Sequence, residues 1–152
     1  MSIIHCHDFN SFNLVWVNGV NPAAGGNYGL AINAGYRYAL AAAHFVLTTD
    51  ANAANRIPRI GFTNALGILA ETVVNVPLTA SLGWHIDVQS GAVYSPVVDP
   101  GSHHIMCGSG SHAVIINANQ FFITIDNIQA ADQISAIQFC LRQWQSPELM
   151  AT

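Results

Sequence analysis

The clearest structural signal in the chain is the segment Leu82-Gly83-Trp84-His85-Ile86-Asp87-Val88-Gln89. Large apolar residues occupy every second position, and glycine or polar residues fill the positions between them. Because successive side chains of a β-strand point to opposite faces, this period of two indicates a strand with one buried and one solvated face. The segment therefore predicts that this part of the chain belongs to a β-sheet.

Shorter apolar runs lie on both sides of this segment, separated by clusters of Gly, Pro, Asn and Asp. None has the 3.6-residue period of an amphipathic helix. The runs that we expect to form strands are 12–17, 40–49, 56–63, 66–76, 82–89, 113–116, 121–125 and 133–144. We expect 56–63 to pair with 40–49 as a hairpin, with Pro58 placing it at a sheet edge or a bulge.

About eight strands with frequent turns predict an all-β fold, an antiparallel β-sandwich of the jelly-roll type. A chain of 152 residues is long enough for one domain with a sizeable core, and its sequence contains no internal repeat. Residues 1–152 are thus predicted to form a single jelly-roll domain. Within it, we expect an extended N-terminal arm at 1–11 and a C-terminal tail at 145–152.

Charged residues are scarce, at 8% of the chain against about 25% in an average soluble domain. Hydrophobic residues make up 51%, and the basic residues number only four against eight acidic ones. This balance excludes intrinsic disorder and provides no basic stripe for nucleic acid. The longest apolar run, 38–47, is interrupted by His44 and is too short to span a membrane. We therefore expect a subunit that buries surface against other protein, with no nucleic-acid or membrane partner.

The N-terminus and the cysteines indicate synthesis in a reducing cytoplasm. The first residues include neither the basic region nor the apolar region of a signal peptide. Cys6, Cys107 and Cys140 are odd in number and widely spaced, which does not favour a disulfide framework.

Two histidine-rich segments contain residue types that ligate zinc or copper. The first segment, His103-His104 with Cys107 and His112, has one loose cluster, whereas structural zinc sites have two ligand pairs. The second segment, His5-Cys6-His7-Asp8, lacks the glutamate that follows the His-x-His of metal-binding cupins. We expect no metal and no cofactor, and assign these histidines to subunit contacts.

No catalytic motif stands out, so we predict a protein that is not an enzyme. The run from Gly108 to His112 lacks the strand–turn–helix context of a nucleophile elbow. Asp50, Asp99 and Asp132 lie in turn sequences, where aspartate caps backbone amides. Asp87 and Asp126 lie on expected strands and are the one acidic pair that could meet across a face.

Aromatic residues leave a lectin open as an alternative, since tryptophan and tyrosine rings are platforms on which sugars stack. Trp84 and Trp144 occupy strand positions typical of core residues, and Trp16 is a further candidate platform. Tyr28, Tyr36 and Tyr38 surround Arg37, and we expect them to be partly exposed.

Two long segments and one short one resemble small virion proteins of tailed bacteriophages. Residues 45–60, Phe45-Val46-Leu47-Thr48-Thr49-Asp50-Ala51-Asn52-Ala53-Ala54-Asn55-Arg56-Ile57-Pro58-Arg59-Ile60, are similar to a hairpin of those proteins in which Thr-x-Asp and an Ala/Asn turn precede Asn-Arg. Residues 131–144, Ala131-Asp132-Gln133-Ile134-Ser135 through to Trp144, are similar to their closing strand, with Ala131 in place of a glycine and Gln143 in place of an acidic residue. Leu82-Gly83-Trp84 is similar to their Gly-Trp.

The resemblance implies a capsid decoration, or cement, protein, a homotrimer that binds the major capsid protein on the exterior of the virion and stabilises the head. Other virion parts (a collar, tail or head-fibre subunit) and a jelly-roll lectin are the alternatives. We expect contacts from the N-terminal arm and from the 18–27 and 90–112 loops. Arg56 and Arg59 are either further contacts that pair with acidic groups on the shell or ordinary hairpin residues with nothing to bind. The candidate contact residues are Ile3, Ile4, His5, His7, Phe9, Tyr28, Tyr36, Arg56, Arg59, His103 and His104.

Overall fold

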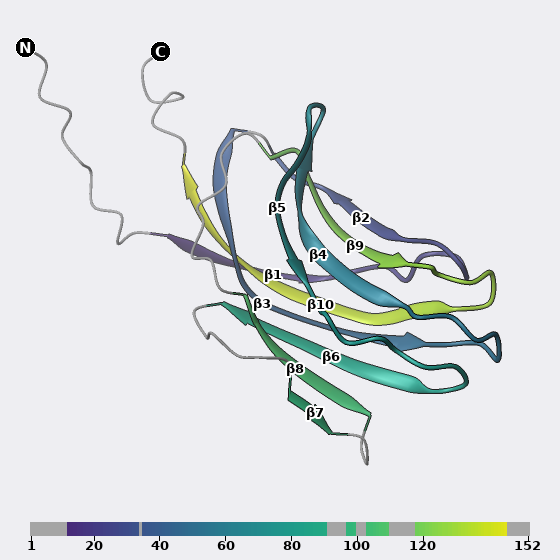
Figure 1. The fold of residues 1–152 in the computed structure, drawn as a ribbon. Coiled ribbons are helices and arrows are strands. Elements are labelled where there is room, and N and C mark those ends of the chain that lie inside the picture. The colour runs from purple at the N-terminus through teal and green to yellow at the C-terminus, as the bar shows by residue number, and fades with distance from the viewer. Residues whose placement is uncertain (1–11, 34, 91–96, 100–102, 110–117, 146–152) are drawn as a thin grey trace, which may run out of the picture.

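Two β-sheets face each other in the computed structural model, which describes residues 12–33, 35–90, 97–99, 103–109 and 118–145 (Figure 1). These residues form ten strands and no helix, hence no helix that could cross a membrane. The strands are β1 (Asn13–Asn18), β2 (Tyr28–Ala31), β3 (Tyr36–Thr48), β4 (Ile57–Asn64), β5 (Gly67–Val73), β6 (Gly83–Ser90), β7 (Val97–Asp99), β8 (His104–Ser109), β9 (Gln120–Asp126) and β10 (Gln133–Gln145). The expected N-terminal arm and strand 113–116 lie outside the described residues.

The strand order confirms the predicted jelly-roll sandwich. One sheet has the order β1-β10-β3-β6-β8-β7, and the other has the order β2-β9-β4-β5. Apart from β7 and β8, the strands pair in a nested antiparallel pattern, with β1 on β10, β2 on β9, β3 on β6 and β4 on β5. This nesting, with the pairs divided between two sheets, is the double-sheet arrangement of a jelly roll.

The predicted hairpin between 40–49 and 56–63 is wrong. β3 lies in the six-stranded sheet and β4 in the four-stranded sheet, so the chain crosses from one sheet to the other between Thr48 and Ile57. Pro58 is also not at an edge, because β4 lies between β9 and β5. Local sequence identifies both strands but not their partners, since turn residues serve a sheet-to-sheet crossing as well as a hairpin.

The six-stranded sheet is widened by a short insertion, β7 and β8, in the segment 90–112 whose sequence predicts a loop. β8 pairs in parallel with β6, and β7 pairs antiparallel with β8 at the edge. Ile105 and Cys107 of β8 are buried between the sheets, whereas Met106 is exposed. The alternation extends over too few residues to stand out among the surrounding glycines and serines.

The core lies between the two sheets, as the alternation in β6 predicts. Trp84, Ile86 and Val88 are buried, and the residues between them are exposed or half-buried on the outer face. Phe121 of β9 stacks on Phe139 of β10 with ring centroids 4.3 Å apart, joining the sheets near the centre. Each such fully buried side chain contributes about 1.5–3 kcal/mol to the stability of the fold.

Candidate interaction surfaces

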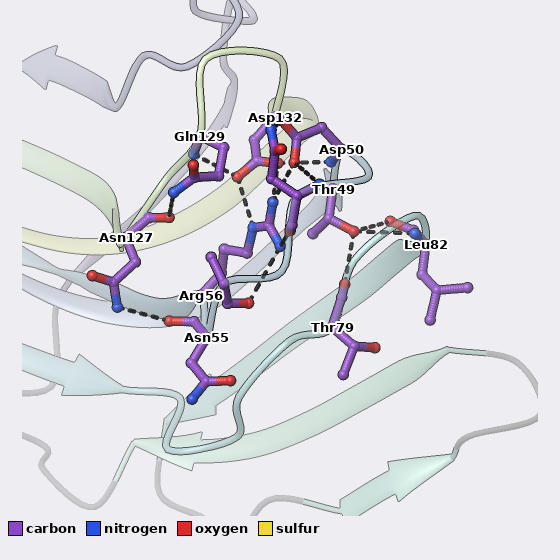
Figure 2. Close-up of polar contacts among 11 residues, drawn as sticks. Thr49, Asp50, Asn55, Arg56, Thr79, Leu82, Asn127, Gln129 and Asp132 are labelled. Carbon is purple, nitrogen blue, oxygen red and sulfur yellow. Dashed lines mark hydrogen bonds and ion pairs between the residues drawn. The ribbon is translucent and has the colours of Figure 1, made fainter.

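Arg56 is fully buried at one end of the sandwich, where it binds two aspartates (Figure 2). Its Nε donates to Oδ2 of Asp132 at 2.9 Å, and its Nη2 donates to Oδ1 of Asp132 at 3.0 Å and of Asp50 at 2.6 Å. Its Nη1 donates to the carbonyl of Asn52 at 2.8 Å. The expectation that Arg56 pairs with acids on a capsid shell is therefore wrong, because its guanidinium is enclosed by its own chain.

The same network closes the turns at this end. Asp132 also accepts from the backbone N–H groups of Asp50 and Gln129, both at 2.8 Å, so it caps amides as its turn sequence predicts. Burial opposes ionisation of Asp132, but the hydrogen bonds from Arg56 and the two amides outweigh it and hold the pKa of this carboxyl below its ordinary value. The hydroxyl of Thr49 bonds to the carbonyls of Thr79 and Leu82 (Figure 2). Together these bonds hold the β3–β4 crossing in place.

Arg59 is partly exposed on the outer face of the four-stranded sheet, but it also has partners in its own chain. Its guanidinium pairs with Asp126 at 2.8 Å and with Glu71 at 2.9 Å. Asp126 does not meet Asp87, because the two residues belong to strands of different sheets. Arg59 therefore offers a satisfied ion pair, not a free cation, to any partner on this face.

The tyrosines are less exposed than predicted. Tyr28 and Tyr38 are buried, with Tyr28 edge-on to Phe139 and Tyr38 stacked on Phe62. Burial raises the pKa of both phenols. Tyr36, the third tyrosine, is half-buried. Tyr28 and Tyr38 consequently have no ring face available for stacking on a sugar, and Tyr28 is not available for a subunit contact.

Three histidines gather on the outer face of the six-stranded sheet, and a fourth, His103, lies beside Trp84. On the outer face, His44 Nδ1 lies 2.8 Å from Oδ1 of Asp87, and Nε2 of His104 bonds to the other carboxylate oxygen. The ring of His85 lies 5.9 Å from that of His44 and 6.2 Å from that of His104, centroid to centroid. His103 packs its ring edge-on against Trp84 at 5.3 Å. No group of three metal-ligating side chains with the arrangement of a metal site occurs within the described ranges.

Cys107 and Cys140, the two described cysteines, are free and buried. Burial, with the nearby charge of Asp87, raises the pKa of the Cys107 thiol to about 11. Burial also raises the pKa of the Cys140 thiol. Cys107 belongs to the core between the sheets, and Cys140 is a small buried residue outside that core; neither is a reactive thiolate.

The hairpin of β4 and β5 exposes apolar side chains that the sequence analysis did not single out. Leu66 at its tip is 95% exposed, followed by Ile68 at 62% and Leu69 at 39%. The tip extends beyond the neighbouring strand, because β9 begins at Gln120, opposite Thr63 (Figure 1). The signal for it in the sequence is a leucine in a turn, where polar residues are the rule.

A second apolar surface lies on β1, at the edge of the six-stranded sheet. Trp16 is 71% exposed and Leu14 55% exposed, and both project from the outer face. Trp16 borders a shallow hollow of about 190 Å³ in that face. Trp84 is buried, as its position in β6 predicts, and Trp144 is half-buried beside Phe12.

The remaining candidate contact residues, in the N-terminal arm, lie outside the described residues, as does His112. They are Ile3, Ile4, His5, His7 and Phe9.

No family model and no curated protein matches the chain. Among solved structures, a chain from the disulfide-linked pili of Bacillus endospore appendages is 12% identical, covering 93% of this chain and 96% of that chain. Its TM-score is 0.32, a likeness too weak to support a conclusion about this chain.

Proposed function

We propose that this chain is a non-enzymatic structural subunit that assembles with copies of itself, and that it decorates the exterior of a phage head. The observation that supports self-assembly is the exposed apolar tip of the β4–β5 hairpin. In this proposal the subunit is a homotrimer that bridges neighbouring copies of the major capsid protein.

The hairpin has two properties of an assembly surface. Leu66, Ile68 and Leu69 place apolar area in water on a segment that has few neighbours of its own. β5 is also an edge strand, whose outer N–H and C=O groups have no partner strand among the described residues. Exposed apolar patches and open strand edges mark sites where another chain adds on.

A closed trimer requires that two different surfaces of each subunit meet. The hairpin projects from one end of the four-stranded sheet, so it is suited to reach a neighbour's surface other than its own hairpin (Figure 1). A standard interface buries about 800 Å² per partner. A subunit with contacts on two sides and on the shell has less need of surface charge, in keeping with its 8% content of charged residues.

The acidic residues support a structural role. Asp50 and Asp132 are bound to Arg56, Asp126 to Arg59 and Asp87 to two histidines. Each therefore neutralises or orients a group of its own chain.

Self-assembly is tested by sedimentation velocity on the wild type and on the double variant Leu66→Asp/Ile68→Asp. The wild type should sediment as one oligomer, and the double variant should sediment as a monomer. The circular dichroism spectrum of the double variant should match that of the wild type, which shows that the monomer is folded. Leu14→Asp is the control, because Leu14 is 55% exposed but lies on β1 of the six-stranded sheet. A monomeric wild type, or an oligomer that survives the double substitution, would contradict assembly through the hairpin.

The capsid role needs a separate measurement. Wild-type protein should bind expanded phage heads that lack decoration, in hundreds of copies per head counted by quantitative mass spectrometry. Copy numbers in the tens would instead indicate a collar or tail component, and no binding would contradict the virion assignment.

A further inference from the structure

The hollow beside Trp16 is formed by four adjacent strands. In the sheet register, Trp16 of β1 pairs with Cys140 of β10, which pairs with Ala42 of β3, which pairs with Gln89 of β6. The two residues between tryptophan and glutamine are small, so the sheet surface is low there and the larger side chains form walls. Its lining includes Trp16, Ala42, His44, Asp87, Gln89 and Gln138.

One wall of the hollow is aromatic and the others are polar. The indole of Trp16 is 71% exposed, so its ring is accessible to a bound molecule. Gln89 and Gln138 are exposed, and their side-chain amides have no hydrogen-bond partner among the described residues. Each amide supplies two N–H donors and a carbonyl acceptor. Between them, the His44–Asp87 pair fixes a carboxylate that has lone pairs left to accept further hydrogen bonds.

We propose that this hollow binds one pyranose ring of a neutral glycan. A pyranose has an apolar face of C–H groups, which stacks on the electron-rich face of an indole. Its hydroxyl groups both donate and accept, and so do the amides of Gln89 and Gln138. A few well-placed polar groups beside an aromatic ring are typical of small-molecule sites. The hollow has a volume of about 190 Å³, which is smaller than the sites that bind drug-sized ligands.

The charge of the lining determines the class of sugar. None of the lining residues is an arginine, and lysine is absent from the sequence. The lining contains one carboxylate, that of Asp87, and a carboxylate repels sulfated, phosphorylated or sialylated sugars. The strands that carry the lining include the central members of the sheet, so the site is already formed before a ligand arrives.

The chemistry of the walls also distinguishes this hollow from a subunit contact. An apolar side chain of another subunit would cover Gln89, Gln138 and Asp87 without offering them partners, and a desolvated, unpaired polar group costs about 1–3 kcal/mol. The hollow also lies on the outer face of the six-stranded sheet, whereas the proposed assembly hairpin belongs to the four-stranded sheet. Sugar binding and assembly through the hairpin are therefore independent of each other.

The test is binding of the intact protein to an array of neutral oligosaccharides that end in glucose, galactose, mannose or N-acetylglucosamine, with sialylated and sulfated versions beside them. The best neutral ligand is then titrated while tryptophan fluorescence is recorded. Since Trp84 is buried, a shift of emission to shorter wavelength that is absent in Trp16→Phe reports burial of Trp16. We expect Trp16→Ala to abolish binding, and Gln89→Ala and Gln138→Ala each to weaken it about tenfold.

Two controls make the result decisive. Leu14→Ala removes an exposed side chain from the same face of β1 without touching the hollow, and Gln120→Ala removes an exposed glutamine from the other sheet. Both should bind as the wild type does. The proposal is overturned if no neutral sugar binds, if acidic sugars bind better, or if Trp16→Ala binds normally. It is also overturned if Trp16→Ala dissociates the oligomer, because Trp16 would then be a subunit contact.

Discussion

Replacing Asp132 by asparagine should destabilise the fold strongly, although the two side chains have nearly the same shape. The side chains of Asp132 and Arg56 are both completely buried. Asparagine would remove the negative charge. Its side chain has one carbonyl oxygen and one N–H₂ group, so only one of the two guanidinium N–H groups that now bond to Asp132 would keep an acceptor. The buried Arg56 would then retain only Asp50 as an anionic partner.

The expected magnitude follows from the cost of removing one partner of a buried ion pair, about 3–5 kcal/mol. Domains of this size unfold with about 5–15 kcal/mol, so the variant would lose about a fifth of its stability or more. With a urea m-value near 2 kcal/mol/M, the unfolding midpoint should fall by about 1.5–2.5 M. Equilibrium urea unfolding, followed by tryptophan fluorescence and far-ultraviolet circular dichroism, measures this shift.

Two further variants separate the charge network from ordinary packing. Asp126→Asn breaks the exposed pair with Arg59 and should shift the midpoint far less, because solvent screens that pair. Arg56→Met/Asp132→Asn removes both buried charges and should be destabilised by less than the sum of the single variants, with a coupling of about 0.5–3 kcal/mol. If Asp132→Asn unfolds within about 0.5 M urea of the wild type, the argument from buried charge fails.

Three other outcomes can be checked. Gly61→Ala should lower the melting temperature by several degrees or prevent folding, because a Cβ there would lie 2.1 Å from the carbonyl oxygen of Ala70. Gly83→Ala is the control and should melt near the wild type, because a Cβ at Gly83 meets nothing within 4 Å. The thiol of Cys107, with a pKa of about 11, should resist iodoacetamide at pH 8 until urea unfolds the chain, as peptide mass spectrometry would reveal. The pKa of the Asp132 carboxyl is lower in the folded chain than in the unfolded chain. Its contribution to the free energy of unfolding is therefore complete at pH values above the unfolded pKa. It is lost as pH falls through the folded value, so urea midpoints should drop below about pH 4, and less so in Asp132→Asn.

The sequence predicts those parts of the fold that depend on local periodicity. β6 was predicted with the correct buried face because a half-buried strand has a period of two. β10 was predicted within one residue, but its alternation breaks near Ala136, which has φ of 49°. A bulge there shifts the register against β3 between Ser135 and Gln138, so Ile134 and Ile137 are both buried. Residue types alone do not identify where an extra residue enters a strand.

The candidate surfaces were predicted less well, because they depend on contacts between distant segments. Arg56 resembles an exposed hairpin residue in sequence, and only Asp132, 76 positions later, explains its burial. The hollow beside Trp16 requires small residues on β3 and β10 to lie between β1 and β6, an arrangement that only the strand order specifies. Composition predicted that apolar surface would be exposed, but not that a hairpin tip would carry it.

The position of β10 has a consequence for how the chain reaches its native state. β10 is the last of the ten described strands to be synthesised, yet it lies inside the six-stranded sheet, between β1 and β3. Until β10 arrives, both of these strands have an open edge, and β2 likewise waits for β9. Contacts between such distant segments close slowly, and open edges in the meantime favour aggregation. The larger sheet is therefore expected to form only after β10 has been made, and the chain should be most prone to aggregate before that point.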